Sequence, residues 1–170
     1  MQFEYSLNLI STENKISEYF ETAEKCWEAG QYEEAFKWYR LAAEQGDAVA
    51  QKKLGNCYFD GDGVEQNYAE AAKYFRLAAE QGYLVAQYNL GICYENGWGV
   101  EEDAEEAAKW YSEAAKQGDS KAQNNLAVCY ENGYGVEQNI DKAIEWYRKA
   151  SNNGCEEAKE ALDELLKRRQ

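Results

Sequence analysis

The side chains that could do chemistry in this sequence are carboxylates and thiols, because the chain contains no histidine. Without histidine, Ser-His-Asp and Cys-His nucleophilic catalysis are excluded, as is every zinc site that needs an imidazole ligand. General acid–base chemistry would fall to Glu, Asp, Lys or Tyr. The carboxylates occupy solvated faces of predicted helices at equivalent places in a repeat. We therefore expect no catalytic residue, no cofactor and no enzymatic activity.

Four of the five cysteines occupy related positions. Cys57, Cys93 and Cys129 follow one another at a constant interval, and Cys26 takes the same place in a shorter first unit. Neighbouring helices in a stack lie about 10 Å apart, whereas a disulfide needs Cα atoms within about 7 Å. No C-x-x-C pair indicates a metal or redox site. We expect reduced, partly buried thiols, with Cys155 the most exposed.

Only the stretch from Asp60 to Gly63, followed by Glu65, hints at a cation site. It lacks the twelve-residue frame of a calcium loop that ends in Glu. The equivalent loops read Asn-Gly-Trp-Gly and Asn-Gly-Tyr-Gly, and they follow helices rather than strands, which excludes a dinucleotide-binding fingerprint. We predict a turn between two helices here and no metal site.

The interval of the cysteines recurs across most of the chain. Gly46, Gly82, Gly118 and Gly154 are each 36 residues apart (82−46, 118−82, 154−118). A period of this size is typical of a solenoid, in which each unit is too small to bury its own apolar face and stacks on its neighbours. We predict an all-α fold, a right-handed α-solenoid of stacked antiparallel helix pairs. The same interval separates Leu54, Leu90 and Leu126, and the rings of Tyr39, Phe75, Tyr111 and Tyr147.

One small residue inside the first helix of each unit predicts a close contact between helices. Gly91 lies in the middle of the helix expected at about residues 85–96, where it costs about 1 kcal/mol relative to Ala. Gly55 takes the same place one unit earlier, and Ala127 takes it one unit later. These three residues are all small, so the second helix of the pair is expected to pack closely against this position.

The third unit contains Leu90-Gly91, Tyr94, Gly97-x-Gly99-Val100, Ala107, Trp110-Tyr111, Ala114-Ala115 and Gln117-Gly118. This pattern resembles the Sel1-like repeat, a relative of the tetratricopeptide repeat with a longer loop between its helices. The resemblance implies a non-enzymatic module that binds other proteins as an adaptor or scaffold. The family also contains secreted members with two disulfide-bonded cysteines per repeat; this chain lacks the second cysteine, which argues against that branch.

We predict an N-terminal arm at residues 1–14 and a single solenoid domain at 15–170. In the arm, Phe3, Tyr5, Leu7 and Leu9 alternate with polar residues, which is typical of an extended segment. Such an arm could be mobile or loosely docked, could lie in a groove of its own solenoid, or could pair with a strand of a partner. The predicted units are about 15–46, 47–82, 83–118 and 119–154, followed by a capping helix at 155–169.

The charge of the chain indicates the kind of partner. With 32 acidic and 18 basic residues, its net charge is −14. Such a charge repels nucleic acid and anionic membranes and favours a basic protein or peptide. We find no apolar run long enough for a transmembrane helix and no basic-then-apolar secretory signal. We therefore expect a cytoplasmic monomer that binds neither nucleic acid nor membrane.

The resemblance places a partner on the concave face formed by the first helix of each unit. Four residues there are apolar inside a polar rim and could anchor a partner, or they could close the inner helix layer. Trp98 and Tyr134, in the variable slot of the Gly-x-Gly loops, could form a second contact along the loop edge or pack on their own loops. The predicted concave-face residues are Lys52, Asn56, Phe59, Tyr88, Ile92, Glu95, Asn124, Val128 and Glu131.

Two other functions fit the same features. A cytosolic immunity or antitoxin protein that masks a basic toxin domain would also be small, acidic and non-catalytic. A regulatory domain of an enzyme system is the alternative of another class. The primary prediction is a protein–protein interaction module.

Overall fold

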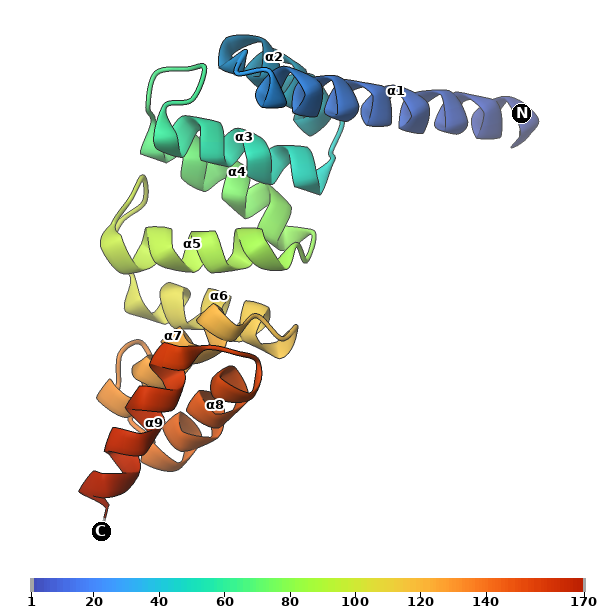
Figure 1. Ribbon diagram of the computed structural model, residues 1–170. Helices are drawn as coiled ribbons and strands as arrows, with labels where there is room; N and C mark the ends of the chain where they lie inside the picture. The colour runs from blue at the N-terminus through green and yellow to red at the C-terminus, as the bar shows by residue number, and fades with distance from the viewer. Residues whose placement is uncertain (1, 170) are drawn as a thin grey trace. The chain divides into compact units, whose positions relative to one another are not determined.

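The computed structural model describes the backbone of residues 2–169 and the side chains of residues 14–169. Over this range the chain forms nine α-helices and no strand, which confirms the predicted all-α class (Figure 1). None of these helices combines the length and the apolar character needed to cross a lipid bilayer. The helices are α1 Gln2–Glu28, α2 Tyr32–Glu44, α3 Ala48–Asp60, α4 Tyr68–Glu80, α5 Leu84–Asn96, α6 Ala104–Lys116, α7 Ser120–Asn132, α8 Ile140–Asn152 and α9 Glu156–Arg168.

The chain divides into two compact units, Met1–Gln81 with α1–α4 and Gly82–Gln170 with α5–α9. Within each unit every helix packs against the helix that follows it, as expected for the stacked helix pairs of an α-solenoid. At the end of the second unit, α9 buries Ala158 and Leu165 against the α7/α8 pair and so acts as the predicted capping helix.

Side-chain caps define where most helices begin. The carboxylates of Asp47, Asp103 and Asp119 accept hydrogen bonds from backbone N–H groups in the first turns of α3, α6 and α7. Asn67 and Asn139 do the same for α4 and α8. Each such cap contributes about 1 kcal/mol. These signals are local, which is why the helix boundaries follow the sequence closely.

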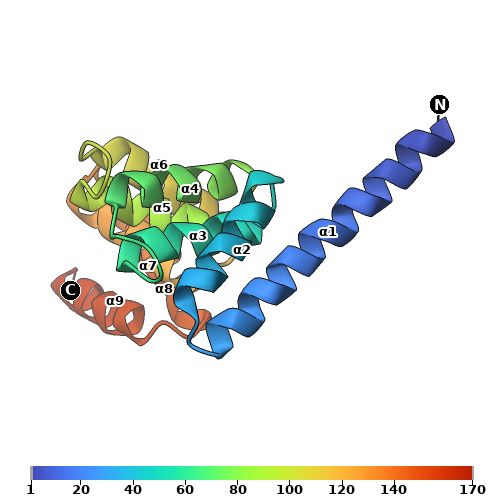
Figure 2. The ribbon, with the colours of Figure 1, turned by 90° about the horizontal axis from the view of Figure 1, so that it is seen from above.

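The prediction of an extended arm at residues 1–14 is wrong, because α1 is one continuous helix of 27 residues. Figure 2 shows the N-terminal half of α1 continuing past the other helices of its unit. Once the C-terminal half is held by packing against α2, each added helical residue gains a backbone hydrogen bond without a new nucleation cost. Phe3, Leu7 and Ile10 also have helical spacing, so the alternation was ambiguous. Met1 and the side chains of residues 2–13 lie outside the described part.

In the second, third and fourth repeats, the small residue of the first helix lies against the recurring ring of the second helix, as predicted. A Cβ atom on Gly55 would lie 2.6 Å from the Phe75 ring, and one on Gly91 would lie 2.6 Å from the Tyr111 ring. In the fourth repeat Ala127 and Tyr147 are buried in one cluster. The close approach of the helices therefore depends on the absence of a larger side chain at this position.

The second glycine of the Gly-x-Gly loop contacts the preceding repeat. Gly63 has φ +71°, and a Cβ atom there would overlap the carbonyl group of Tyr32 at the start of α2. In the second unit, a Cβ atom on Gly135 would overlap the carbonyl group of Ala104 at the start of α6. The loop thus packs backbone against backbone, which only glycine allows.

A buried glutamine in α3 and another in α7 link successive helix pairs. Gln123 donates from Nε2 to the carbonyl oxygen of Ala115 (3.0 Å), and its Oε1 accepts a hydrogen bond from Asn153 (3.0 Å). Gln51 is bonded in the same way to Ala43 and Gln81 (3.2 and 2.7 Å). Because a buried amide must be paired, these bonds fix the register between one pair and the next.

Candidate functional site

In the first unit, the predicted site residues Lys52, Asn56 and Phe59 all lie on α3 and are half-buried. The Phe59 ring lies 5.0 Å from the Tyr68 ring and 6.4 Å from the Phe75 ring, centroid to centroid. Phe59 therefore packs within its own helix pair, as the alternative interpretation expects. Burial lowers the pKa of Lys52, and the charge of the adjacent Lys53 lowers it further.

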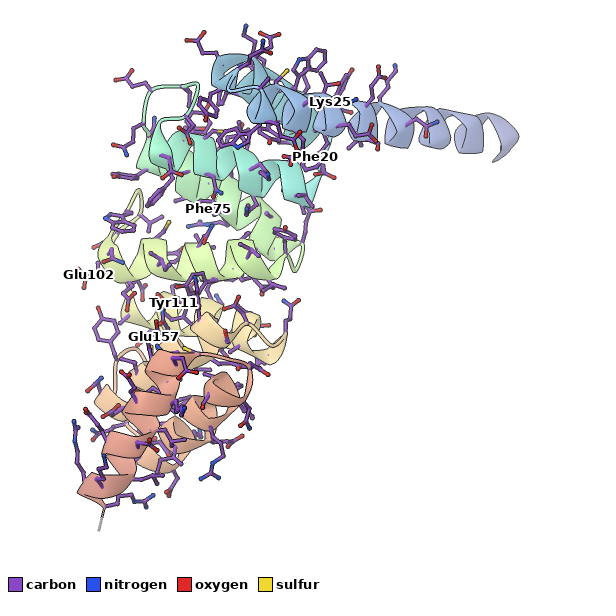
Figure 3. All side chains as sticks on the ribbon, in the orientation of Figure 1. Phe20, Lys25, Phe75, Glu102, Tyr111 and Glu157 are labelled. Atoms are coloured by element: carbon purple, nitrogen blue, oxygen red, sulfur yellow. The ribbon has the colours of Figure 1, made fainter. Side chains whose placement is uncertain are left out.

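The first unit also has a hollow between α1 and the start of α3. It has a volume of about 380 Å³, and Ile16, Ser17, Phe20, Asp47 and Val49 line it. Figure 3 labels Phe20 on α1, at this edge of the unit. The tetratricopeptide groove positions do not include Ile16 and Phe20. The helical spacing that these two residues share with Ala23 and Trp27 is the signal that could have found them.

In the second unit, two of the predicted anchors pack against the core. Tyr88 and Ile92, on α5, are half-buried against a cluster that includes Tyr111, and the Tyr88 and Tyr111 rings lie 6.0 Å apart. Val128, on α7, differs from them because its side chain is 39% exposed. Asn124 lies one helical turn before Val128, and Glu131 lies nearly one turn after it, so the three share a face of α7.

Two of the predicted acidic residues are bound to buried tyrosines. The hydroxyl of Tyr111 donates to Oε2 of Glu95 at 2.7 Å, and the hydroxyl of Tyr147 donates to Oε2 of Glu131 at 2.8 Å. Burial, and then the hydrogen bond to the carboxylate, raise the pKa of both tyrosines. Figure 3 labels Tyr111. In each glutamate, Oε2 thus accepts the tyrosine hydrogen bond, and Oε1 takes no part in that bond.

We call Tyr88, Ile92, Glu95, Asn124, Val128 and Glu131 the α5/α7 face. All six belong to the second unit, and all but Val128 are half-buried. The field of Glu95 on α5 reaches α7, because it adds to the burial that raises the pKa of Cys129 to about 11. The face therefore combines apolar surface with carboxylates in fixed positions.

The loop-edge residues are both partly exposed, Trp98 by 36% and Tyr134 by 37%. The hydroxyl of Tyr134 donates to Oε1 of Glu102 in the preceding loop at 3.1 Å, and Figure 3 labels Glu102. This bond raises the pKa of Tyr134. Tyr134 therefore reaches back to the previous loop.

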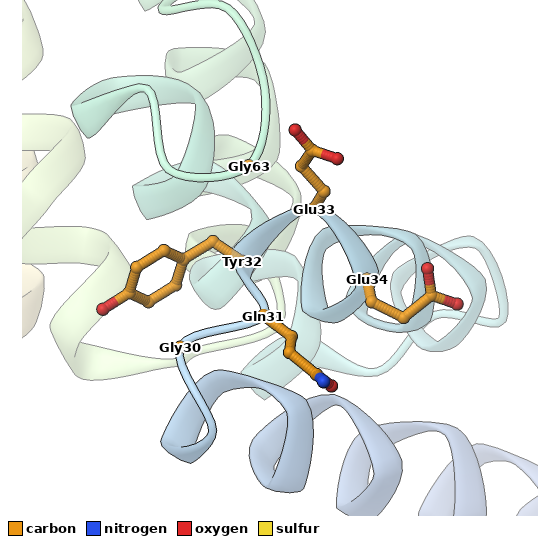
Figure 4. A pocket seen from close by; sticks show the side chains of 6 residues that line it. All are labelled: Gly30, Gln31, Tyr32, Glu33, Glu34 and Gly63. Atoms are coloured by element: carbon orange, nitrogen blue, oxygen red, sulfur yellow. The ribbon is translucent and has the colours of Figure 1, made fainter.

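A shallow hollow of about 620 Å³ lies beside the Gly-x-Gly loop that contains Gly63 (Figure 4). Its walls are Gly30, Gln31, Tyr32, Glu33, Glu34 and Gly63. Figure 4 shows the side chains of Glu33 and Glu34 pointing in different directions, so they do not form a carboxylate pair. The described lining offers no nucleophile with an adjacent base.

The cysteines are free thiols, and four of the five are buried. Burial raises the pKa of Cys57 and of Cys93 to about 12. The prediction that Cys155 is the most exposed is wrong: it is buried, whereas Cys26 is only half-buried. Cys155 occupies the N-cap position of α9 and packs in the same cluster as Ala150 and Ala158, so the capping helix covers it. Among the side chains of residues 14–169, no group of His, Cys, Asp and Glu could hold a metal ion.

Comparison with known proteins agrees with this architecture. The model of the Sel1 repeat matches residues 29–47, 48–83, 84–119 and 120–155, and the short first match corresponds to the unit that lacks the long loop. Helix α1 precedes the matched residues. The matches together cover most of the chain.

Three relatives illustrate the similarity. An exopolysaccharide production negative regulator of Rhizobium leguminosarum bv. viciae is 41% identical over 58 residues, which are 34% of this chain and 22% of the regulator. A protective antigen of uropathogenic Escherichia coli that displays an SLR fold is 36% identical, with a TM-score of 0.79 over 81% of this chain and 29% of the antigen. A Sel1 repeat protein from Oxalobacter formigenes is 35% identical, with a TM-score of 0.79 over 84% of this chain and 59% of that protein.

The chain thus spans less than two thirds of each of these relatives. The similarity lies in the repeats, which recur at the interval seen in the sequence and fold as the helix pairs described above. On this evidence the chain belongs to the Sel1 repeat family.

Proposed function

We propose that this chain is an adaptor or scaffold that binds a basic partner polypeptide through the first-helix faces of its repeats. Sel1 repeats generally mediate protein–protein interactions, which supports the proposal that this chain binds another protein. The net charge of −14 supports a basic partner, since charge complementarity steers the encounter.

The observation that carries the proposal is the α5/α7 face of the second unit. Val128 exposes 39% of its side chain on the same face as the tyrosine-bound Glu131, and the tyrosine-bound Glu95 lies on α5 of the same unit. An exposed apolar side chain among fixed carboxylates suits a partner segment that has both apolar and basic residues. Tyr88 and Ile92 support this surface from beneath, because both pack on the core.

A regulatory role is the second candidate function. It is favoured by the similarity to the Rhizobium negative regulator, although the chain spans only 22% of that protein. An immunity or antitoxin role would use the same acidic surface against a basic toxin domain. The three roles differ in the partner and share the α5/α7 face, so identification of the partner separates them.

Site-specific photocrosslinking tests the proposal. A photoreactive amino acid is placed at Val128 and, in a matched control, at Leu77 on the second helix α4, which is equally exposed at 39%. In the source cell we expect position 128 to form an adduct with one basic protein and position 77 to form none. Equal adducts at both positions, or none at either, would contradict the proposal.

A further inference from the structure

Three buried tyrosines in this chain each donate a hydrogen bond to a glutamate on the first helix of their own pair. The pairs are Tyr39 with Glu24, Tyr111 with Glu95 and Tyr147 with Glu131. In each case burial and the bound carboxylate raise the pKa of the tyrosine. The three carboxylates therefore share a tyrosine donor, although Glu24 lies one helical turn earlier in its helix than Glu95 and Glu131 do in theirs.

Two of the three carboxylates also bind a basic side chain. Oε1 of Glu24 lies 2.8 Å from Nζ of Lys53, and Oε1 of Glu131 lies 3.5 Å from a guanidinium nitrogen of Arg168. Burial acts to raise the pKa of Glu24, but the bonds from Lys53 and Tyr39 outweigh it and lower the pKa. A cation is thus the second partner of the carboxylate in the first and fourth repeats.

In both cases the cation comes from the helix that follows the pair, although from different turns of that helix. Lys53 lies on α3, after the α1/α2 pair, and Arg168 ends α9, after the α7/α8 pair. For Glu95 and Tyr111, on α5 and α6, the following helix is α7. Its Asn125, two repeat intervals after Lys53, bonds to Tyr111 instead.

Glu95 forms no ion pair with any described side chain. The one lysine of α7, Lys121, instead acts on Glu157 of α9, whose pKa is lowered chiefly by its backbone hydrogen bond and by Cys155, and further by this lysine. The other charged residue of the α5/α7 face is Glu131, which is also a carboxylate. Glu95 is therefore held by Tyr111 and lacks the cation that its two counterparts have.

We propose that Glu95 receives an arginine or lysine side chain of the bound partner, which supplies the cation that Lys53 and Arg168 supply to the other two carboxylates. The inference rests on the proposed function and specifies the chemistry of its partner. Oε2 of Glu95 already accepts from Tyr111, so Oε1 accepts a charge-assisted N–H bond from the partner. An apolar residue beside that cation contacts Val128. The partner segment is thus a basic residue flanked by aliphatic residues.

NMR titration of the full chain tests this inference with two synthetic peptides, acetyl-Gly-Leu-Arg-Leu-Gly-amide and its citrulline counterpart. Citrulline has nearly the shape of arginine without the charge. We expect the arginine peptide to shift the amide signals around Glu95, Asn125 and Val128 at millimolar concentration. We expect the citrulline peptide to bind about fivefold more weakly, since an ion pair at such a site contributes about 1 kcal/mol.

Protein variants locate the cation. Glu95→Gln keeps an acceptor for the Tyr111 hydroxyl and is expected to remove the preference for arginine. The control Glu145→Gln, whose carboxylate binds Lys149 on the second helix α8, is expected to keep that preference. Arg168→Ala frees Glu131 and is expected to add a second set of shifts there. Equal binding of the two peptides, unchanged affinity of Glu95→Gln, or no shift near Glu95 would overturn the inference. If photocrosslinking at position 128 still captures a partner after such a result, the proposed function stands and only the proposed role of Glu95 is lost.

Discussion

The rings of Phe59 and Phe75 lie 6.4 Å apart in the second repeat, at the two places that Glu95 and Tyr111 occupy in the third (95−59 and 111−75 are both 36). Both members of the polar pair are thus replaced together by apolar rings. Removing only one partner leaves a polar group unpaired, whereas replacing both can be nearly neutral. The position therefore accepts either pair but not a mixture of the two.

A double-mutant cycle on the second repeat tests this rule. We expect Phe75→Tyr to destabilise the chain by about 1 kcal/mol, because the new hydroxyl faces a phenyl ring. Adding Phe59→Glu supplies the acceptor and is expected to recover about that amount as coupling energy. Urea unfolding of the four proteins measures it. Additive effects of the two substitutions would contradict the rule.

The Gly-x-Gly loop offers a matched pair of glycines. Gly61 and Gly63 both have positive φ, but a Cβ atom on Gly61 would have its nearest neighbour at 3.5 Å, whereas one on Gly63 would overlap the Tyr32 carbonyl. We expect Gly61→Ala to cost about 1–2 kcal/mol for the backbone conformation alone. Gly63→Ala should cost about 1–3 kcal/mol more because of the overlap. Equal denaturation midpoints would show that the loop does not depend on the contact with α2.

Alkaline pH is expected to destabilise the helix stack. Burial raises the pKa of Cys57 and Cys93 from 9.0 to about 12, and burial with the bound carboxylate raises that of Tyr111 above its ordinary 10.0. The folded state therefore retains protons that the unfolded state loses. This stability is complete below about pH 9 and is lost as the pH rises toward about 12.

Melting temperatures from neutral to alkaline pH measure this loss, and Tyr111→Phe provides the comparison. Because that variant cannot ionise at position 111, its melting temperature should fall less steeply above about pH 10 than that of the wild type. Parallel curves would show that Tyr111 does not contribute to the alkaline loss of stability.

Cys26, which is only half-buried, should react with a thiol reagent at neutral pH before the buried Cys57 does.

The sequence predicted the fold because its signals are local and periodic. Caps such as Asp103, the glycines at helix ends and the close contact at Gly91 each act within one helix pair, and the structure has them where the pattern places them. For the first 14 residues this approach gave the wrong conformation, because a short apolar run fits both the period of a strand and the period of a helix. There α1 extends a helix that its C-terminal half already nucleates.

The site was less predictable, because a side chain's partner depends on helices far apart in sequence. Periodicity placed Tyr88, Ile92 and Val128 on one kind of face, but it could not tell that the first two support the core while Val128 is exposed. The contacts of Glu95 with Tyr111 and of Glu131 with Arg168 likewise have no signal in the spacing. They follow from how the second helix and the capping helix meet the first-helix face. Whether these residues bind a partner stays a prediction.

The most direct test of the central claim is the affinity of the partner captured through position 128 for the Val128→Asp chain, measured by calorimetry against Leu77→Asp. Both side chains are 39% exposed, so neither change should unfold the protein. We predict that Val128→Asp weakens binding at least about tenfold, as expected for an anchor in an interface, that Leu77→Asp leaves it unchanged, and that wild-type affinity falls as salt rises. Equal affinities of the two variants would contradict the claim that the α5/α7 face holds the partner.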